Sequence, residues 1–232
     1  MDTARYAICF APEQGSALEL FSHEWFGKDG AFSKASASIP GISVNRFLEL
    51  TEGPRNYGMH GTLKPSFELV SHTTESNLLE SAEIVAKRLK PVVLPPMELG
   101  EVANIVALVL RASTAPLEMF AALCVRSFDG YRRHLTPEEE DHFRRNRLTV
   151  HQEQMLEHWG YPYVMEEFDF HISVTDPVAN RKERAAMLKA LRKIAAPVLG
   201  KSIEIRELCI FSQRSAKHPM TIIARIPFGH RA

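Results

Sequence analysis

FDFHISV, from Phe168 to Val174, is the stretch of this 232-residue sequence that decides the fold, and MHGTLK, from Met59 to Lys64, is its counterpart. Each contains a tripeptide of the form His-x-Thr/Ser within an apolar, alternating run that predicts a β-strand. Side chains at positions i and i+2 of a strand point to the same face of a sheet. Each tripeptide therefore presents an imidazole beside a hydroxyl group.

The two pairs, His60 with Thr62 and His171 with Ser173, suit acid–base chemistry on a phosphate group. Imidazole titrates near neutral pH, so one ring can take a proton while the other gives one. The hydroxyl groups can donate hydrogen bonds to the phosphoryl oxygens. The choice of acid and base depends on the orientation of the substrate and stays open. For each histidine alone, the alternative is a hydrogen-bonded residue of a buried strand.

The same order of elements follows both motifs, since each predicted strand is followed by one helix and two further strands. We expect the helices at about 74–90 and 180–196, and the strands at 97–102, 104–111, 202–212 and 220–227. This repeat of pattern predicts two similar α+β lobes, each contributing one histidine to a shared cleft.

The predicted organisation is a single bilobal domain over residues 1–232. A His-x-Thr unit spans about 55–111, a helical insert about 113–160, and a His-x-Ser unit about 165–228. Within the insert we expect one helix at 115–128. A second is expected from the Thr136 cap, which is followed by Pro and Glu residues, to about 158.

Composition narrows the partners of this protein. The 28 Lys and Arg residues balance 28 Asp and Glu residues, whereas proteins that bind long nucleic acids are usually more basic. We therefore expect a small phosphorylated substrate and no obligate protein partner. The sequence contains neither a long apolar run nor a signal-peptide pattern, which predicts no membrane association. Three distant cysteines and the scattered histidines follow no metal spacing, so we expect a cytoplasmic protein without metal or cofactor.

Several further residues are candidates for substrate binding. Lys64 lies two positions after Thr62, so strand alternation predicts it on the His60 face, where it would meet a phosphate group. A solvent-exposed strand lysine is the alternative. Tyr57, Tyr161 and Tyr163 come just before the two motifs and are candidates to line the cleft and stack on a base or sugar. Ordinary aromatic packing is the alternative.

Two candidates are less specific. Arg55 is a candidate for binding a second phosphate group. Tyr6 opens the first predicted strand together with Arg5, and these side chains either reach the cleft or pack at a sheet edge.

The paired tripeptides resemble the 2H phosphoesterase superfamily, which includes bacterial RNA 2′,3′-cyclic phosphodiesterases of the LigT type. The chain is most similar to its DUF1045 branch, whose members are described as phosphonate-metabolism proteins. The resemblance extends over nearly the whole sequence, through RYAICFAP at 5–12, RNYGMHGTLKPSF at 55–67, WGYPY at 159–163 and FDFHIS at 168–173. Ser173 stands where the superfamily often has threonine, which keeps the hydroxyl group.

The resemblance implies two pseudo-symmetric antiparallel sheets with outer helices and a central cleft, in which His60, Thr62, His171 and Ser173 are catalytic. The expected activity is metal-independent hydrolysis of a cyclic phosphodiester in a small phosphorylated sugar or nucleotide, with a cyclic phosphate of ribose as the natural candidate in phosphonate metabolism. Two alternatives remain open. One is a cyclic phosphodiesterase or joining enzyme that acts on RNA ends, and the other is a non-catalytic module that binds a phosphorylated metabolite or an RNA end.

Overall fold

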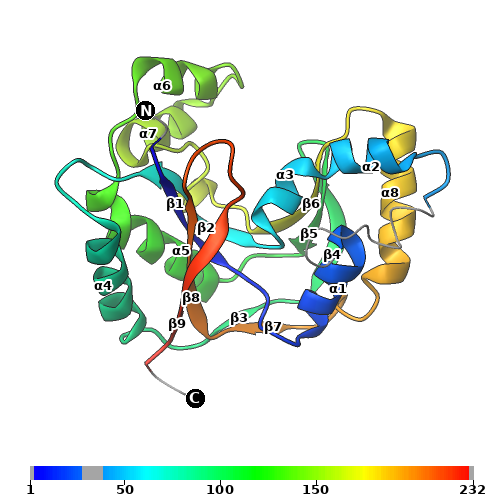
Figure 1. Cartoon of the computed structure of the whole chain (residues 1–232), viewed down its shortest axis with the longest axis horizontal. Coiled ribbons are helices and arrows are strands. Elements are labelled where there is room, and N and C mark those ends of the chain that lie inside the picture. The colour runs from blue at the N-terminus through cyan, green and yellow to red at the C-terminus, as the bar shows by residue number, and fades with distance from the viewer. Residues whose placement is uncertain (1–2, 28–38, 230–232) are drawn as a thin grey trace.

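The structure, a computed structural model, describes residues 3–27 and 39–229, which form two lobes side by side (Figure 1). The strands are β1 (Arg5–Phe10), β2 (Gly61–Glu68), β3 (Val92–Leu94), β4 (Met97–Val102), β5 (Ile105–Leu110), β6 (His171–Pro177), β7 (Ile203–Ile205), β8 (Glu207–Gln213) and β9 (Thr221–Pro227). The α-helices are α1 (Ala17–Phe26), α2 (Val44–Leu50), α3 (Glu52–Tyr57), α4 (Glu75–Ala86), α5 (Ala115–Phe128), α6 (Pro137–Arg144), α7 (Val150–Trp159) and α8 (Arg181–Ile194). Two short 3-10 turns, η2 (Asp129–Tyr131) and η3 (Met165–Glu167), flank the α6–α7 region.

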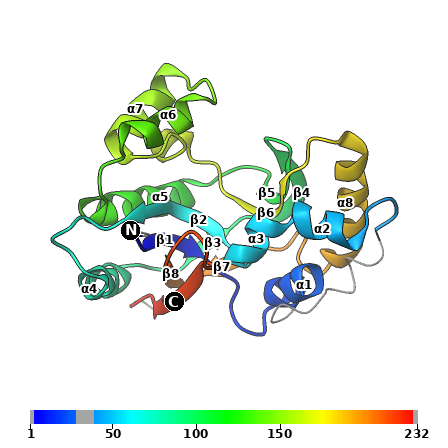
Figure 2. The same ribbon diagram turned by 45° about the horizontal axis from the view of Figure 1, so that its top comes forward.

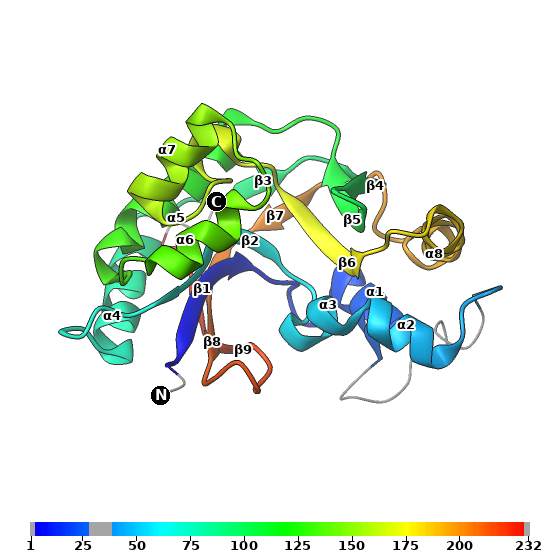
Figure 3. The same cartoon turned by 90° about the horizontal axis from the view of Figure 1, so that it is seen from above.

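Each lobe is built on an antiparallel sheet. One lobe holds four strands in the order β2-β1-β8-β9, and helices α4 and α5 pack against this sheet. The other lobe holds three strands in the order β4-β5-β6, with α8 packed against β4 and β5 (Figure 3). The α+β class, the two antiparallel sheets and the outer helices that the sequence predicted are therefore confirmed.

The lobes exchange strands, which the repeat in the sequence did not predict. The hairpin β4–β5, which follows the first motif in the chain, pairs with the strand of the second motif, β6. The hairpin β8–β9, which follows the second motif, belongs to the sheet that contains the first motif strand, β2. Each lobe therefore needs both sequence units.

The short strands β3 and β7 lie at two of the places where the chain crosses between lobes. They pair antiparallel with each other, Val93 opposite Glu204, and lie between the lobes in Figure 1. Each crossing strand thereby supplies the backbone partners of the other, which satisfies polar groups that a single connecting segment would leave unpaired.

Two predicted elements are interrupted. The helix expected from Thr136 to about 158 consists of α6 and α7, because Arg147 is left-handed (φ 52°) and Thr149 begins a new helix with its own capping box. The strand expected at 202–212 is divided at Arg206 into β7 and β8, which belong to different sheets. In Figure 2, α6 and α7 stand above the four-stranded lobe as a separate layer.

Candidate active site

Both motifs line one cavity between the lobes, with a volume of about 630 Å³. His60 and Thr62 come from β2 and the residue before it, at one edge of the four-stranded sheet. His171 and Ser173 come from β6, at the edge of the three-stranded sheet. Alternation holds within each tripeptide, since Gly61 and Ile172, which separate the histidine from the hydroxyl residue, are buried.

The two imidazoles are held in the same way. Nδ1 of His60 lies 2.9 Å from the carbonyl oxygen of Gly58, and Nδ1 of His171 lies 2.9 Å from that of Asp169. A carbonyl oxygen only accepts, so Nδ1 carries the hydrogen in both rings and Nε2 is left for other partners. In each case the anchoring carbonyl lies two residues before the histidine, so the motif fixes its own ring through local backbone.

The surroundings of the two rings differ. The His60 ring stacks on Tyr57 (centroids 4.9 Å apart, planes at 22°) and packs against Phe211 at 5.9 Å. Burial of His60 lowers its pKa, the Gly58 carbonyl opposes this, and the proximity of His171 lowers the pKa further. The cavity is also lined by two acidic residues that precede His171 in the chain, Glu167 and Asp169.

Gly61 and Phe170 hold the two motif strands together. Gly61 stands between His60 and Thr62, and a Cβ at this position would overlap the Phe170 ring. Phe170, immediately before His171, is 1% exposed. The absence of a side chain at residue 61 thus lets the two strands approach closely enough for both histidines to share the cavity.

The placement of Lys64 corrects the sequence prediction. Ile8 pairs with Lys64 and Cys9 with Thr62, so one step along β1 spans two residues of β2, and Leu63 is the extra residue of a bulge. A bulge of one residue reverses the alternation of the strand, so Lys64 no longer shares the face of Thr62. The ammonium group instead lies beneath α5, 3.4 Å from the carbonyl oxygen of Val125 and 3.5 Å from Asp129.

Burial of Lys64 predicts a pH-dependent stability. The residue is 2% exposed, and burial lowers its pKa to about 8, although Asp129 opposes this shift. An unfolded lysine keeps its proton to about pH 10.4, so the cost of the buried charge disappears as the pH rises from about 8 to that value. The native protein therefore gains up to about 3 kcal/mol over this range from Lys64 alone.

Lys64→Met removes this gain, because no titratable group remains buried at residue 64. Asp129 keeps a partner in this variant, since Arg132 still pairs with it at 2.8 Å. We expect the variant to be at least as stable as the native protein at pH 7 and the difference between them to shrink by pH 10. Urea unfolding of both proteins at pH 7, 8.5 and 10 measures this difference. A difference that does not change with pH would contradict the assignment.

The predicted tyrosines occupy three positions around the site. Tyr161 and Tyr163 line the cavity and contact each other edge to face, with their centroids 5.6 Å apart. Tyr57 lies behind the cavity wall, stacked on His60. Burial raises the pKa of both Tyr57 and Tyr161, so both hydroxyls stay protonated at neutral pH.

Arg55 and Tyr6 do not line the cavity. Arg55 ties α3 to the end of α2, where its guanidinium donates to Thr51 at 3.2 Å and to the carbonyl oxygen of Leu48 at 3.0 Å. Tyr6 faces α4, because alternate residues of β1 point to opposite faces, and its hydroxyl donates to Glu75 at 3.0 Å.

The cavity also contains residues that the sequence did not single out. Asn146 and Glu167 reach it from the region of α6 and α7, and Ala103, in the turn between β4 and β5, has a left-handed backbone (φ 48°). None of them belongs to a recognisable motif. The described residues that line this cavity include no lysine or arginine.

Two further properties concern the described residues only. Residues 3–27 and 39–229 hold no group of three or more His, Cys, Asp or Glu side chains placed to bind a metal ion. Within the same ranges, no helix has the length and apolarity that crossing a membrane requires.

Fold and site together define a bilobal α+β protein with two histidines in one interlobe cavity. The chain belongs to the DUF1045 family, described as proteins of unknown function, which it matches over residues 62–221. The predicted resemblance to this family is thereby confirmed.

Comparison with curated proteins finds a relative of greater length. The chain is 31% identical over 238 residues to the ribose 1,5-bisphosphate phosphokinase PhnN of Janthinobacterium sp. (strain Marseille), an alignment that covers 98% of this chain and 52% of that protein. The chain thus spans about half the length of the curated relatives it matches.

Comparison with solved structures finds chains of similar size. One is a crystal structure of a phosphoesterase, with a TM-score of 0.47 and 13% identity over 98% of this chain and 99% of that one. Another is E. coli LigT complexed with phosphate, with a TM-score of 0.45 and 12% identity over 98% and 99% of the two chains.

Proposed function

We propose that this protein is a metal-independent phosphodiesterase of the two-histidine type, which hydrolyses a cyclic phosphodiester in a small phosphorylated sugar or nucleotide. One observation carries the proposal. Two imidazoles, each anchored through Nδ1 to its own backbone, line the same cavity with one hydroxyl group beside each. The cavity volume of about 630 Å³ suits a small ligand.

The surroundings of His60 support an assignment of roles to the two histidines. His60 is partly buried against Tyr57 and Phe211, which keeps its ring neutral and its Nε2 lone pair free, as a general base requires. His171 lines the same cavity and supplies the second imidazole, so with His60 as the base it is left to give the proton to the leaving oxygen. His171 is therefore the general acid.

The reaction follows from these roles. His60 Nε2 takes a proton from a water molecule, and the water oxygen forms a bond to phosphorus. The bond from phosphorus to one ring oxygen breaks, and His171 gives its proton to that oxygen. The product is a phosphomonoester with a free hydroxyl group, and proton exchange with solvent restores both rings. Thr62 and Ser173 donate hydrogen bonds to the non-bridging oxygens, where negative charge accumulates.

A cyclic phosphate of ribose is the substrate class we favour. The curated relatives carry the name of an enzyme that acts on ribose 1,5-bisphosphate. Opening a cyclic phosphodiester in a ribose that already carries one phosphate yields a ribose bisphosphate. The proposed hydrolysis would thus supply the kind of compound that these names specify, which supports a role for this protein in phosphonate metabolism.

The test is turnover of a panel of cyclic phosphates after exhaustive treatment with EDTA. The panel contains ribose 1,2-cyclic phosphate, 2′,3′-cyclic nucleotides, and an RNA oligonucleotide with a 2′,3′-cyclic end. We expect the ribose compound to be hydrolysed fastest, with full activity in EDTA. Because burial lowers the pKa of His60, we expect kcat/KM to fall on the acid side only below the ordinary imidazole value of 6.5.

Other outcomes identify the alternatives. Faster turnover of the RNA end would point to an enzyme of RNA ends, and tight binding without turnover would point to a binding module. Activity that EDTA abolishes and Mn²⁺ or Zn²⁺ restores would overturn the mechanism.

A further inference from the structure

We propose that a second pocket, beside the cavity of the two histidines, is a binding subsite for an additional phosphate group of the substrate, and that Arg5 is the residue that recognises it. This inference rests on the proposed function, because it specifies which cyclic phosphates the protein prefers. It assigns to the substrate two anionic groups, one at the histidines and one at Arg5.

The second pocket adjoins the cavity directly. It has a volume of about 350 Å³ and lies between the strands β1 and β2 and the region of α6. Pro65 and Tyr161 line both spaces, so they form the boundary between them. A ligand seated at the histidines therefore needs to extend only past Tyr161 to reach the second pocket.

Arg5 lies on the face of the four-stranded sheet that carries the catalytic hydroxyl. Alternate residues of β1, Arg5, Ala7 and Cys9, share this face, and the Cys9 thiol lies within hydrogen-bonding reach of Thr62. Tyr57 packs against the same face and stacks on His60. The guanidinium group of Arg5 is near enough to Tyr57 to interact with its hydroxyl electrostatically.

Arg5 keeps donors for a ligand, unlike its neighbour Arg133. Arg133 forms hydrogen bonds with Glu68 at 3.0 Å and with both oxygens of Glu139 at 3.0 and 3.1 Å. The ion pairs of Arg5 with Glu68 and Glu139, at 3.5 and 3.6 Å, are longer than charge-assisted hydrogen bonds. Its side chain is 47% exposed, so these carboxylates orient the guanidinium without occupying it.

The second pocket contains the basic side chains that the cavity of the histidines lacks. Three arginines (Arg5, Arg132 and Arg133) and two glutamates (Glu68 and Glu139) line the pocket. Arg132 is paired with Asp129 at 2.8 Å, so Arg5, whose ion pairs are the longest, is the cation most available to a ligand. The cavity of the histidines, by contrast, has no lysine or arginine among its described lining residues. A second phosphate group therefore finds its cation in the pocket of Arg5, and guanidinium geometry suits a phosphate.

The experiment compares ribose 1,2-cyclic phosphate with and without a 5-phosphate group, in the native protein and in Arg5→Gln. We expect the native protein to prefer the 5-phosphorylated compound by about 10–100-fold in kcat/KM, as one charge-assisted contact provides. In Arg5→Gln this preference should fall to within about threefold. The loss should appear in KM, because Arg5 lies away from the reacting atoms.

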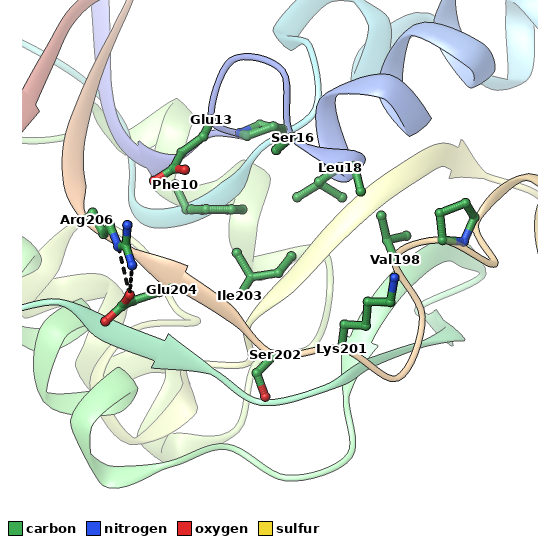
Figure 4. Close-up of a pocket in the computed structure, with 13 residues that line it drawn as sticks. Phe10, Glu13, Ser16, Leu18, Val198, Lys201, Ser202, Ile203, Glu204 and Arg206 are labelled. Atoms are coloured by element: carbon green, nitrogen blue, oxygen red, sulfur yellow. Dashed lines mark hydrogen bonds and ion pairs between the residues drawn. The ribbon is translucent and has the colours of Figure 1, made fainter.

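Two further variants serve as controls. Arg5→Lys keeps the charge and should retain part of the preference, which separates recognition from a loss of folding. Arg206→Gln alters an arginine of another pocket, between α1 and β7, that shares no lining residue with the cavity (Figure 4). Arg206 pairs there with Glu204 at 2.7 Å, and its replacement should leave both activities unchanged.

The outcomes separate the subsite from the proposed function. Turnover of both compounds at equal rates, or an equal effect of Arg5→Gln on both, would overturn the subsite and leave the phosphodiesterase standing. If neither compound is hydrolysed, the proposed function fails, and calorimetric binding of ribose 5-phosphate decides the subsite. Binding that Arg5→Gln weakens at least about fivefold would support the subsite, and unchanged or undetectable binding would overturn it.

Discussion

His60→Ala and His171→Ala should each lower kcat on the best cyclic phosphate by about 10²–10⁴-fold, the range of a lost general base or acid. Either change removes one of the two proton transfers and leaves the hydroxyl groups and the cavity in place. The double variant should have a kcat only slightly below that of the less active single variant, because the effects of residues that act as a unit are not additive. Thr62→Ala and Ser173→Ala should have smaller effects and also raise KM.

Steady-state kinetics measures the loss of rate, and thermal unfolding of the same variants shows whether they remain folded. Both histidines are partly exposed, so their replacement should not disturb folding. His218→Ala is the matched control. This exposed histidine bonds to Ser215 at 2.8 Å and does not line the cavity, so its loss should leave the rate unchanged. Near-native activity in either motif variant would remove that histidine from the mechanism.

Phe170→Ala should lower the free energy of unfolding by about 3–5 kcal/mol, the usual cost of truncating a buried aromatic residue. The Phe170 ring packs near Phe10 and Phe168, with centroids 6.3 and 6.4 Å away, and covers Gly61. Gly61→Ala should lower the free energy of unfolding by about 1–3 kcal/mol through overpacking, because its methyl group overlaps the Phe170 ring, which cannot move freely. It should also reduce kcat, because it separates the two motif strands.

A double-mutant cycle distinguishes this contact from independent effects. With the ring removed, the methyl group of Gly61→Ala has room, so the substitution should cost less than about 1 kcal/mol in the Phe170→Ala background. Urea unfolding of the four proteins gives the coupling energy. Additive costs would show that Gly61 and Phe170 do not set the separation of the strands.

The sequence by itself determined the features that depend on near neighbours in the chain. Alternation within each motif placed a histidine and a hydroxyl on one face of a strand, and the helix of residues 115–128 was predicted to the residue. The Nδ1 anchors are also local, since each carbonyl lies two residues before its histidine. Periodicity and short-range hydrogen bonding act within a few residues, so a single sequence contains them.

Only the tertiary structure decided which strands share a sheet. Both hairpins follow a motif at a similar distance, and no local signal indicates that each pairs into the opposite lobe. The bulge at Leu63 is equally invisible in the sequence, because it is defined by the register against β1, and it moved Lys64 out of the site. Arg5, 55 residues before His60, reached the pocket beside the cavity through the same pairing. Strand pairing and register depend on the packing of distant residues, and that packing exists only once the chain has folded.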